Sequence, residues 1–305
     1  MARNRYEAQV AFLVRILPQV AKERVFAIKG GTAINLFYRD LPRLSVDIDL
    51  TYLPIEGRQE SLSGINDAMD RIANAVETGI AGARTQRIQG GGGGATRLLA
   101  RLAGAEIKIE TSPVSRGVVH APDSLPVCET VEDEFGYVEM QVVSFEDLFG
   151  GKLHAALDRQ HPRDLYDVKL LYENEGLTDD LFRTFMIYVA SSPRPVHELL
   201  NPNLIDLEQP YFNEFDGLTR SPVGLEELID VRNRLIADIQ SRFDVNIRRY
   251  LLSLHEGTPD FDAIERSGAA DLPAVRWKLL NLNKLKRDNA AKHAEQRGAL
   301  EALLG

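Results

Sequence analysis

Two aspartates separated by one residue, Asp47 and Asp49, are the residues of this chain best suited to bind a divalent metal ion. The segment 46–53 alternates apolar and polar residues, which predicts a β-strand whose successive side chains point to opposite faces. Both carboxylates then project from the same face, roughly 7 Å apart at Cα. Mg²⁺ prefers oxygen ligands and leaves coordination sites for phosphate oxygens, so this pair suits nucleotide chemistry.

A glycine pair, Gly30 and Gly31, lies shortly upstream of the aspartates. It follows the apolar segment 25–28, which predicts a short buried strand, and precedes a helix predicted from Thr32 to residue 38. Glycine permits a tight turn and close backbone approach by a ligand, and the N–H groups at a helix N-terminus attract an anion. Each feature alone is ordinary, but a phosphate site beside metal-binding carboxylates is what nucleotidyl transfer requires.

A second alternating segment, 106–111, predicts a strand with Glu106, Lys108 and Glu110 on one face. An exposed strand with a charge pair explains that segment equally well. Ser45 projects on the same face as Asp47 and could touch a triphosphate.

A later helical region contains charged residues at informative spacing. Lys152 follows a glycine pair at 150–151, and two glycines within a helix cost roughly 2 kcal/mol in propensity and therefore suggest close approach by another group. Asp164 and Asp167 are three residues apart in the next predicted helix, so they share one surface. Asp164 could simply stabilise the first turn of that helix.

The remaining pattern predicts an α/β protein: a small mixed sheet flanked by helices in residues 1–145, then an α-helical domain in residues 146–305. Five glycines at 90–94 predict a hairpin connection or loop, and a loop rich in proline and polar residues is predicted over 112–136. Further helices and strands complete the first domain; they are predicted over 3–23, 56–80, 84–89, 96–102 and 137–143.

Composition excludes several classes of protein. No apolar run approaches the length of a membrane span, the N-terminus lacks the apolar core of a signal peptide, and the single cysteine, Cys128, excludes an internal disulfide. A cytoplasmic protein without a membrane partner is expected. The net charge of −9 argues against broad nucleic-acid binding. Residues 276–297 are the exception, with seven Lys/Arg against two acids. Either a solvated helix face or a local RNA-binding surface would explain this basic stretch.

Four motifs in order resemble the AbiEii/AbiGii toxin family of nucleotidyltransferases, which includes the MenT toxins and belongs to the DNA polymerase β-like superfamily. The motifs read GGTAIN at 30–35, RLSVDIDL at 43–50, GKLHA at 151–155 and RDLYDV at 163–168. The resemblance covers roughly the first 175 residues in ordered motifs and continues more vaguely beyond them.

The resemblance implies an NTP-dependent, pyrophosphate-releasing enzyme that uses Mg²⁺, or Mn²⁺ in its place. It implies a third metal-binding acid at Glu110, with Glu106 as the alternative, and an active-site role for Asp167, either as proton acceptor or as a salt link to Lys152. Triphosphate binding falls to Gly30, Gly31, Thr32, Ser45 and Lys152, and catalysis to Asp47, Asp49, Lys152 and Asp167. The family also implies the tRNA 3′ end as acceptor, a block of translation, and a separately encoded antitoxin.

Three other functions share parts of this pattern. A protein-nucleotidylating enzyme would carry every motif and differ only in its acceptor. A metal-dependent glycosyltransferase could use the Asp-x-Asp pair, although the upstream glycine turn argues against it. A non-catalytic nucleotide- or RNA-binding module would keep the fold without turnover, and the intact acids at 47, 49 and 110 count against it.

Overall fold

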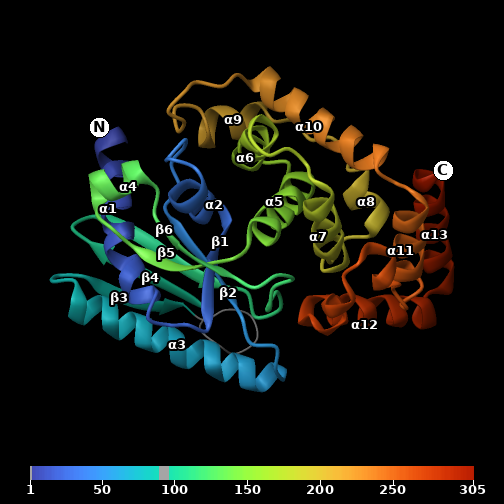
Figure 1. The fold of residues 1–305 in the computed structure, drawn as a ribbon, viewed down its shortest axis with the longest axis horizontal. Helices are drawn as coiled ribbons and strands as arrows, with labels where there is room; N and C mark the ends of the chain where they lie inside the picture. The colour runs from blue at the N-terminus through green and yellow to red at the C-terminus, as the bar shows by residue number, and fades with distance from the viewer. Residues whose placement is uncertain (1, 89–95) are drawn as a thin grey trace. The chain divides into compact units, whose positions relative to one another are not determined.

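The chain divides into two compact units. The computed structural model describes residues 2–88 and 96–305, so the glycine connection predicted at 90–94 lies outside the described residues. The first unit comprises Met1–Ser144 with Leu218–Ser221, and the second comprises Phe145–Gly217 with Pro222–Gly305 (Figure 1). The sequence did not predict the return of 218–221 to the first unit. Two backbone hydrogen bonds hold that segment, Leu44 N to Leu218 O and Arg220 N to Pro42 O, both 2.9 Å.

The first unit is built on one mixed sheet, as predicted. Its strand order is β3-β4-β5-β2-β1-β7-β6. The pairs β2/β5 and β1/β7 are parallel and the other neighbouring strands are antiparallel. The strands are β1 (Phe26–Lys29), β2 (Asp47–Tyr52), β3 (Arg84–Ile88), β4 (Arg97–Leu102), β5 (Ala105–Thr111), β6 (Asp123–Pro126) and β7 (Glu139–Val142).

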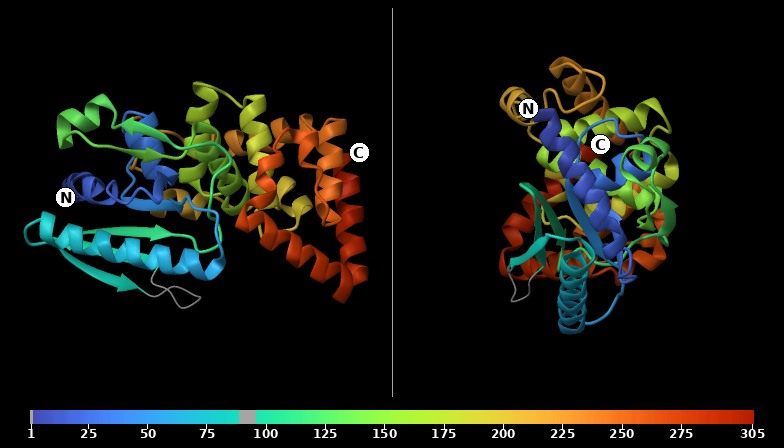
Figure 2. Two further views of the ribbon diagram at one scale, coloured as in Figure 1. Left: turned by 60° about the horizontal axis from the view of Figure 1, so that its bottom comes forward. Right: turned by 90° about the vertical axis from the view of Figure 1, so that its left-hand side faces the viewer.

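Two long helices, α1 (Ala2–Val20) and α3 (Arg58–Gly79), pack on this sheet, and α3 runs along β3 and β4 in Figure 2. Alternation along the central strands explains which side chains they bury. Ile48, Leu50 and Ile109 are fully buried, whereas the charged residues between them stay partly exposed. One sheet face therefore forms the core, and the other carries the charged side chains.

The loop predicted over 112–136 was wrong in part, because it contains β6 and helix α4 (Glu129–Phe135). β6 is a four-residue edge strand that ends in Pro126, and proline removes a backbone donor, so its sequence resembles a loop. Helix α4 buries only Val131 and has four acidic residues, so its sequence lacks the apolar stripe that would predict a helix. The other short helices of this unit are α2 (Gly30–Ala33) and the π-helix η1 (Ile34–Tyr38).

The second unit is helical, as predicted, and several of its helices begin at side chains that cap them. His161, Thr178, Asp244 and Asn289 each accept a hydrogen bond from the first turn of the following helix. The helices are α5 (Phe145–Arg159), α6 (Pro162–Glu173), α7 (Asp179–Ala190), α8 (Val196–Leu200), α9 (Glu208–Glu214), α10 (Leu225–Ser241), α11 (Val245–His255), α12 (Pro273–Asp288) and α13 (Ala290–Leu304), with 3-10 turns at Phe261–Ile264 and Ser267–Asp271.

The glycine pair in α5 permits close helix packing. A Cβ atom on Gly150 would lie 3.1 Å from the ring of Tyr188, and one on Gly151 would lie 3.3 Å from the same ring. The Tyr188 hydroxyl donates to Asp147 at 3.0 Å. The close approach predicted from these glycines therefore comes from an aromatic ring of α7.

Lys278 is a buried lysine on α12 that makes the stability of this unit depend on pH. Burial lowers the pKa of Lys278 to about 8 from its usual 10.5, opposed by the charge of Glu198. The folded state then binds fewer protons than the unfolded state between pH 8 and 10.5, so this group adds stability as pH rises through that window. In chemical denaturation, we expect the wild type to gain up to about 1.4 kcal/mol per pH unit over Lys278→Met. Lys284→Met, at an exposed position of the same helix, is the control.

Candidate active site

The glycine turn of the first unit contacts the side chains of the Asp-x-Asp strand and of the segment before it. Gly30 has a φ of +75°, and a Cβ atom there would lie 2.6 Å from Asp49 Oδ2. A Cβ atom on Gly31 would lie 2.5 Å from Arg43 Nη2 and 3.0 Å from Ser45 Oγ. Only glycine leaves room for these three side chains, so the turn and the strand form one site.

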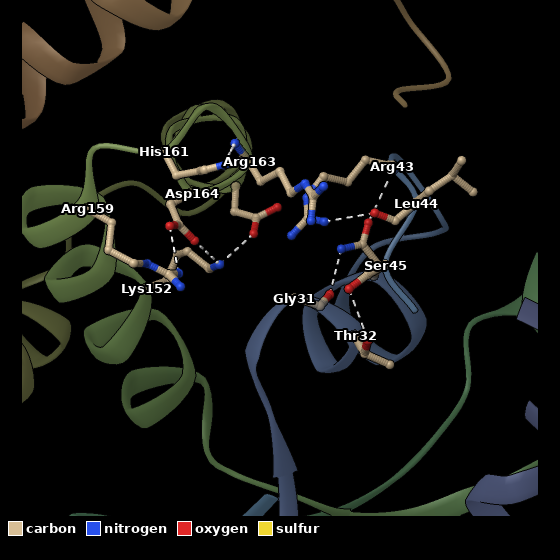
Figure 3. Close-up of polar contacts among 12 residues, drawn as sticks. Gly31, Thr32, Arg43, Leu44, Ser45, Lys152, Arg159, His161, Arg163 and Asp164 are labelled. Carbon is tan, nitrogen blue, oxygen red and sulfur yellow. Dashed lines mark hydrogen bonds and ion pairs between the residues drawn. The ribbon is translucent and has the colours of Figure 1, made fainter. Parts of the chain in front are cut away.

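Hydrogen bonds fix the turn to the strand (Figure 3). The Thr32 hydroxyl donates to the carbonyl of Asp47, so the 3.0 Å contact between Thr32 Oγ1 and Ser45 Oγ leaves Ser45 as donor. Asn35 Nδ2 donates to the Gly31 carbonyl at 2.6 Å and its Oδ1 accepts from the Arg43 amide at 3.2 Å. Thr32 is 1% exposed, so its hydroxyl positions the strand; the triphosphate contacts of Thr32 and Ser45 stay predictions.

A row of charged residues crosses four strands beside the turn. Asp49 is paired in register with Lys29 of β1 on one side and with Glu110 of β5 on the other, and Glu110 is paired with Arg97 of β4. Cross-strand partners project from the same face, so two carboxylates stand between two cations. We call Lys29, Asp49, Glu110 and Arg97 the charged row.

Asp47 and Lys108 form the next pair in register along the same face. Lys108 Nζ lies 3.2 Å from Glu110 Oε1 and 3.9 Å from Asp47 Oδ2, so this ammonium stands between two predicted metal ligands. Arg97 Nε lies 3.1 Å from Glu110 Oε2. These ion pairs neutralise part of the charge that three neighbouring carboxylates would create.

The structure separates the two candidates for the third acid. Glu110 lies beside Asp49, whereas Glu106 pairs with Arg101 at 2.6 Å at the other end of β5. Arg97 and Arg101 thus each pair with an acid of β5.

Burial and charge act in opposite directions on the charged row. Burial raises the pKa of Asp49, the nearby Lys29 opposes that shift, and the Glu110 carboxylate reinforces it. Burial also lowers the pKa of Lys29, while Asp49 and Glu110 raise it. Sequence reasoning gave Lys29 no role, and its position at the end of β1, in register with Asp49, was the missing signal.

The donor chemistry suits a hard divalent ion, because Asp47, Asp49 and Glu110 offer only carboxylate oxygens. Across residues 2–88 and 96–305, however, no group of three His, Cys, Asp or Glu is arranged to hold a metal ion. The ion pairs of Glu110 with Lys108 and Arg97 account for this, because those cations already neutralise its carboxylate. The residues therefore fit a divalent ion once it displaces an ammonium or guanidinium from the acids.

The remaining predicted residues lie in the second unit, where they pair with one another. Lys152 Nζ lies 2.7 Å from Asp164 Oδ1 and 2.8 Å from Asp167 Oδ2, and all three side chains are at most 7% exposed. Arg159 reaches Asp164 Oδ2 at 2.7 Å (Figure 3). Of the two roles suggested for Asp167, the structure contains the salt link to Lys152. The contact of Lys152 with a triphosphate stays a prediction.

Gly30→Ala should disturb the site more than an alanine at another left-handed glycine. Alanine in the left-handed region costs roughly 1–2 kcal/mol, and at Gly30 the new Cβ would also push Asp49 aside. Gly104 has a φ of +86° with nothing within 4 Å of a built Cβ, so Gly104→Ala is the matched control. In thermal unfolding and activity assays, we expect both variants to lose stability but only Gly30→Ala to lose activity. If the two variants were equally active, the contact between Gly30 and Asp49 would have no role in activity.

Comparison with known proteins identifies the family. The family model for the nucleotidyl transferase AbiEii toxin of type IV toxin–antitoxin systems matches residues 11–280. This chain belongs to the AbiEii toxin family. It is therefore a nucleotidyltransferase of a toxin–antitoxin family, as the four motifs predicted, and the family implies an NTP substrate and a separate antitoxin.

A solved structure supports the fold of this AbiEii-family toxin. MenT4, a nucleotidyltransferase toxin from Mycobacterium tuberculosis H37Rv, matches with a TM-score of 0.60 at 15% sequence identity, covering 91% of this chain and 92% of MenT4. Comparison with curated protein sequences found no match. Across the described residues, no helix is both long and apolar enough to cross a membrane.

Proposed function

We propose that this AbiEii-family toxin transfers a nucleoside monophosphate from an NTP to the 3′-terminal hydroxyl of tRNA and thereby blocks aminoacylation and translation. The observation that carries the proposal is the contact between the glycine turn and the Asp-x-Asp strand: Asp49 Oδ2 lies 2.6 Å from where a Cβ atom of residue 30 would be. A phosphate-binding turn and two carboxylates then act on the same phosphate group.

In the proposed reaction, the acceptor oxygen forms a bond to the α-phosphorus, and the bond from that phosphorus to the bridging oxygen breaks, so that pyrophosphate leaves. The proton of the acceptor hydroxyl passes to a carboxylate of the site. The backbone at Gly30 and Gly31 holds the triphosphate, and the Arg43 guanidinium beside Gly31 provides positive charge next to it.

Asp47, Asp49 and Glu110 would hold the divalent ion, for which we propose Mg²⁺ with Mn²⁺ as the alternative. When bound, the ion would neutralise phosphate charge and orient the triphosphate. Lys108 and Arg97 hold Glu110 with ion pairs, and Lys29 supplies charge beside Asp49. Before the ion binds, these cations offset the repulsion among the three acids.

The decisive experiment incubates the purified chain with deacylated tRNA and each of the four NTPs, and measures the mass of the tRNA 3′ ends. Addition of one or more nucleotides with release of pyrophosphate supports the proposal, and Asp49→Asn is the inactive control. Total cellular protein replaces tRNA in a parallel reaction. Label transferred to protein alone would make the acceptor a protein and overturn the tRNA proposal.

Lys108→Met should strengthen divalent-ion binding. The variant removes a positive charge that lies 3.2 Å from Glu110, and a unit charge at about 4 Å in a solvent-accessible site contributes about 1 kcal/mol, or about fivefold in affinity. Isothermal titration with Mg²⁺ measures the change. Lys22→Met, in the exposed turn after α1, is the control and should leave the affinity unchanged.

A further inference from the structure

One face of helix α12 exposes large apolar side chains beside basic ones. Trp277, the single tryptophan of the chain, is 56% exposed, and Leu280 is 65% exposed. The side chains that share this face at helical spacing are also exposed. We call the five residues the Trp277 strip: Trp277, Leu280, Asn281, Lys284 and Arg287.

The strip carries positive charge on an acidic protein. The chain has a net charge of −9, whereas α12 has five Lys/Arg and one acid. Three of these basic residues are not available to a partner. Lys278 is buried, Lys286 pairs with Glu256, and Arg276 pairs with Asp271. Their charges are therefore occupied elsewhere in the second unit.

Lys284 and Arg287 are the cations that the strip offers to a partner. Within the described parts of the chain, Lys284 makes no ion pair. Among the residues that the structure describes, Arg287 pairs only with its neighbour Asp288, and both side chains are well exposed. Such an exposed pair contributes little and exchanges readily for a phosphate.

We propose that the Trp277 strip binds single-stranded RNA, with a base stacked on the indole and the phosphates held by Lys284 and Arg287. The inference rests on the proposed transfer to RNA and locates a surface that holds the acceptor. An exposed aromatic ring beside basic residues is the arrangement that binds unpaired bases, because every base has a stacking face and every nucleotide a phosphate. Asn281 offers both a donor and an acceptor to a base edge.

The same charges disfavour a second copy of this chain as the occupant. A twofold interface would place the strip against itself and gather the positive charges of Lys284 and Arg287 from both copies in one contact, which is repulsive. The exposed apolar surface on the strip is also limited to two side chains, whereas stable protein interfaces bury a larger apolar core.

Because Trp277 is the only tryptophan, the tryptophan fluorescence of the full chain, excited selectively over tyrosine, reports on this site alone. We expect an eight-nucleotide RNA of cytidine and adenosine to quench that fluorescence in a saturable way, and a blunt RNA duplex of the same sequence to quench it far less. Anisotropy of labelled RNA should show roughly tenfold or greater loss of affinity for Trp277→Ala, with partial retention by Trp277→Phe. Lys284→Gln should lower the salt dependence by about 0.7 in log–log slope.

The matched control is Phe212→Ala. Phe212 is 60% exposed on α9, but its helix carries Glu208 and Glu214 and no basic residue, so RNA affinity should not change. Unaltered affinity in Trp277→Ala, or dimerisation of the wild type that Trp277→Ala abolishes without affecting RNA binding, would overturn the proposal. Capture of an acidic protein at the strip without fluorescence quenching by RNA would also overturn it.

These measurements separate the strip from the transfer reaction. If the wild type extends tRNA while Trp277→Ala keeps the same RNA affinity and the same KM for tRNA, the strip proposal fails and the function stands. If RNA quenches Trp277 but no nucleotide is added to tRNA, the function fails and the binding surface stands.

Discussion

Asp49→Asn is expected to abolish nucleotidyl transfer while the protein remains folded. Asp49 lies against the glycine turn and beside Glu110, so its carboxylate is the group that joins the predicted phosphate-binding turn to the proposed metal-binding acids. Loss of a metal-binding carboxylate removes several kcal/mol of transition-state stabilisation, which corresponds to about a 10³-fold lower rate. The measurement is pyrophosphate release with tRNA and the preferred NTP.

Stability provides the control for that result. Burial raises the pKa of Asp49, so asparagine removes a buried charge that costs folding free energy at neutral pH, and Lys29, which loses that partner, keeps Glu110 nearby. Circular dichroism and thermal unfolding should therefore match the wild type. An Asp49→Asn variant that is folded and as active as the wild type would contradict the role of the charged row.

Glu110→Gln and Glu106→Gln test the third acid with two changes on the same face of one strand. Glu110 is level with Asp49, whereas Glu106 pairs with Arg101. We expect the first variant to lose activity by two orders of magnitude or more, as for the loss of one preorganised catalytic group, and the second to stay within a few-fold of the wild type. The reverse result would assign the acid to Glu106.

Local patterns predicted the parts of this site that lie within one short segment. Alternation over 46–53 depends only on which side chains the strand buries, so it placed Asp47 and Asp49 on one face correctly. Gly30 adopts a left-handed conformation in a turn against Asp49, as a glycine between a strand and a helix suggests. Both inferences concern neighbouring residues, for which the sequence contains the necessary information.

The parts that failed depend on contacts between distant segments. The charged row requires the register of four strands, and nothing near Lys29 or Arg97 in sequence indicates that they flank the acids. Similarly, the glycine pair of α5 was correctly associated with close approach, but the approaching group, Tyr188, lies on another helix. The return of 218–221 to the first unit depends on two backbone hydrogen bonds, which leave no side-chain pattern.

Lys152→Met is expected to have the largest effect on stability. The variant leaves the Asp164 and Asp167 carboxylates without an ammonium that lies within 2.8 Å of both, in a place where each side chain is at most 4% exposed. Removing one partner of a buried ion pair costs about 3–5 kcal/mol, because the remaining carboxylates lose that positive charge where water cannot replace it, and Arg159 still pairs with Asp164. Urea denaturation followed by circular dichroism measures this loss.

Lys169→Met is the matched control, since Lys169 also pairs with two acids, but Glu173 and Glu227 are both half exposed. Such pairs contribute about 0–1 kcal/mol, so Lys152→Met should lower the free energy of unfolding severalfold more than Lys169→Met. Adding Asp164→Asn and Asp167→Asn to Lys152→Met removes the buried negative charges and should recover much of the lost stability. The folded Lys152→Met variant also tests the predicted phosphate contact, because an unchanged affinity for NTP would restrict Lys152 to holding α5 and α6 together.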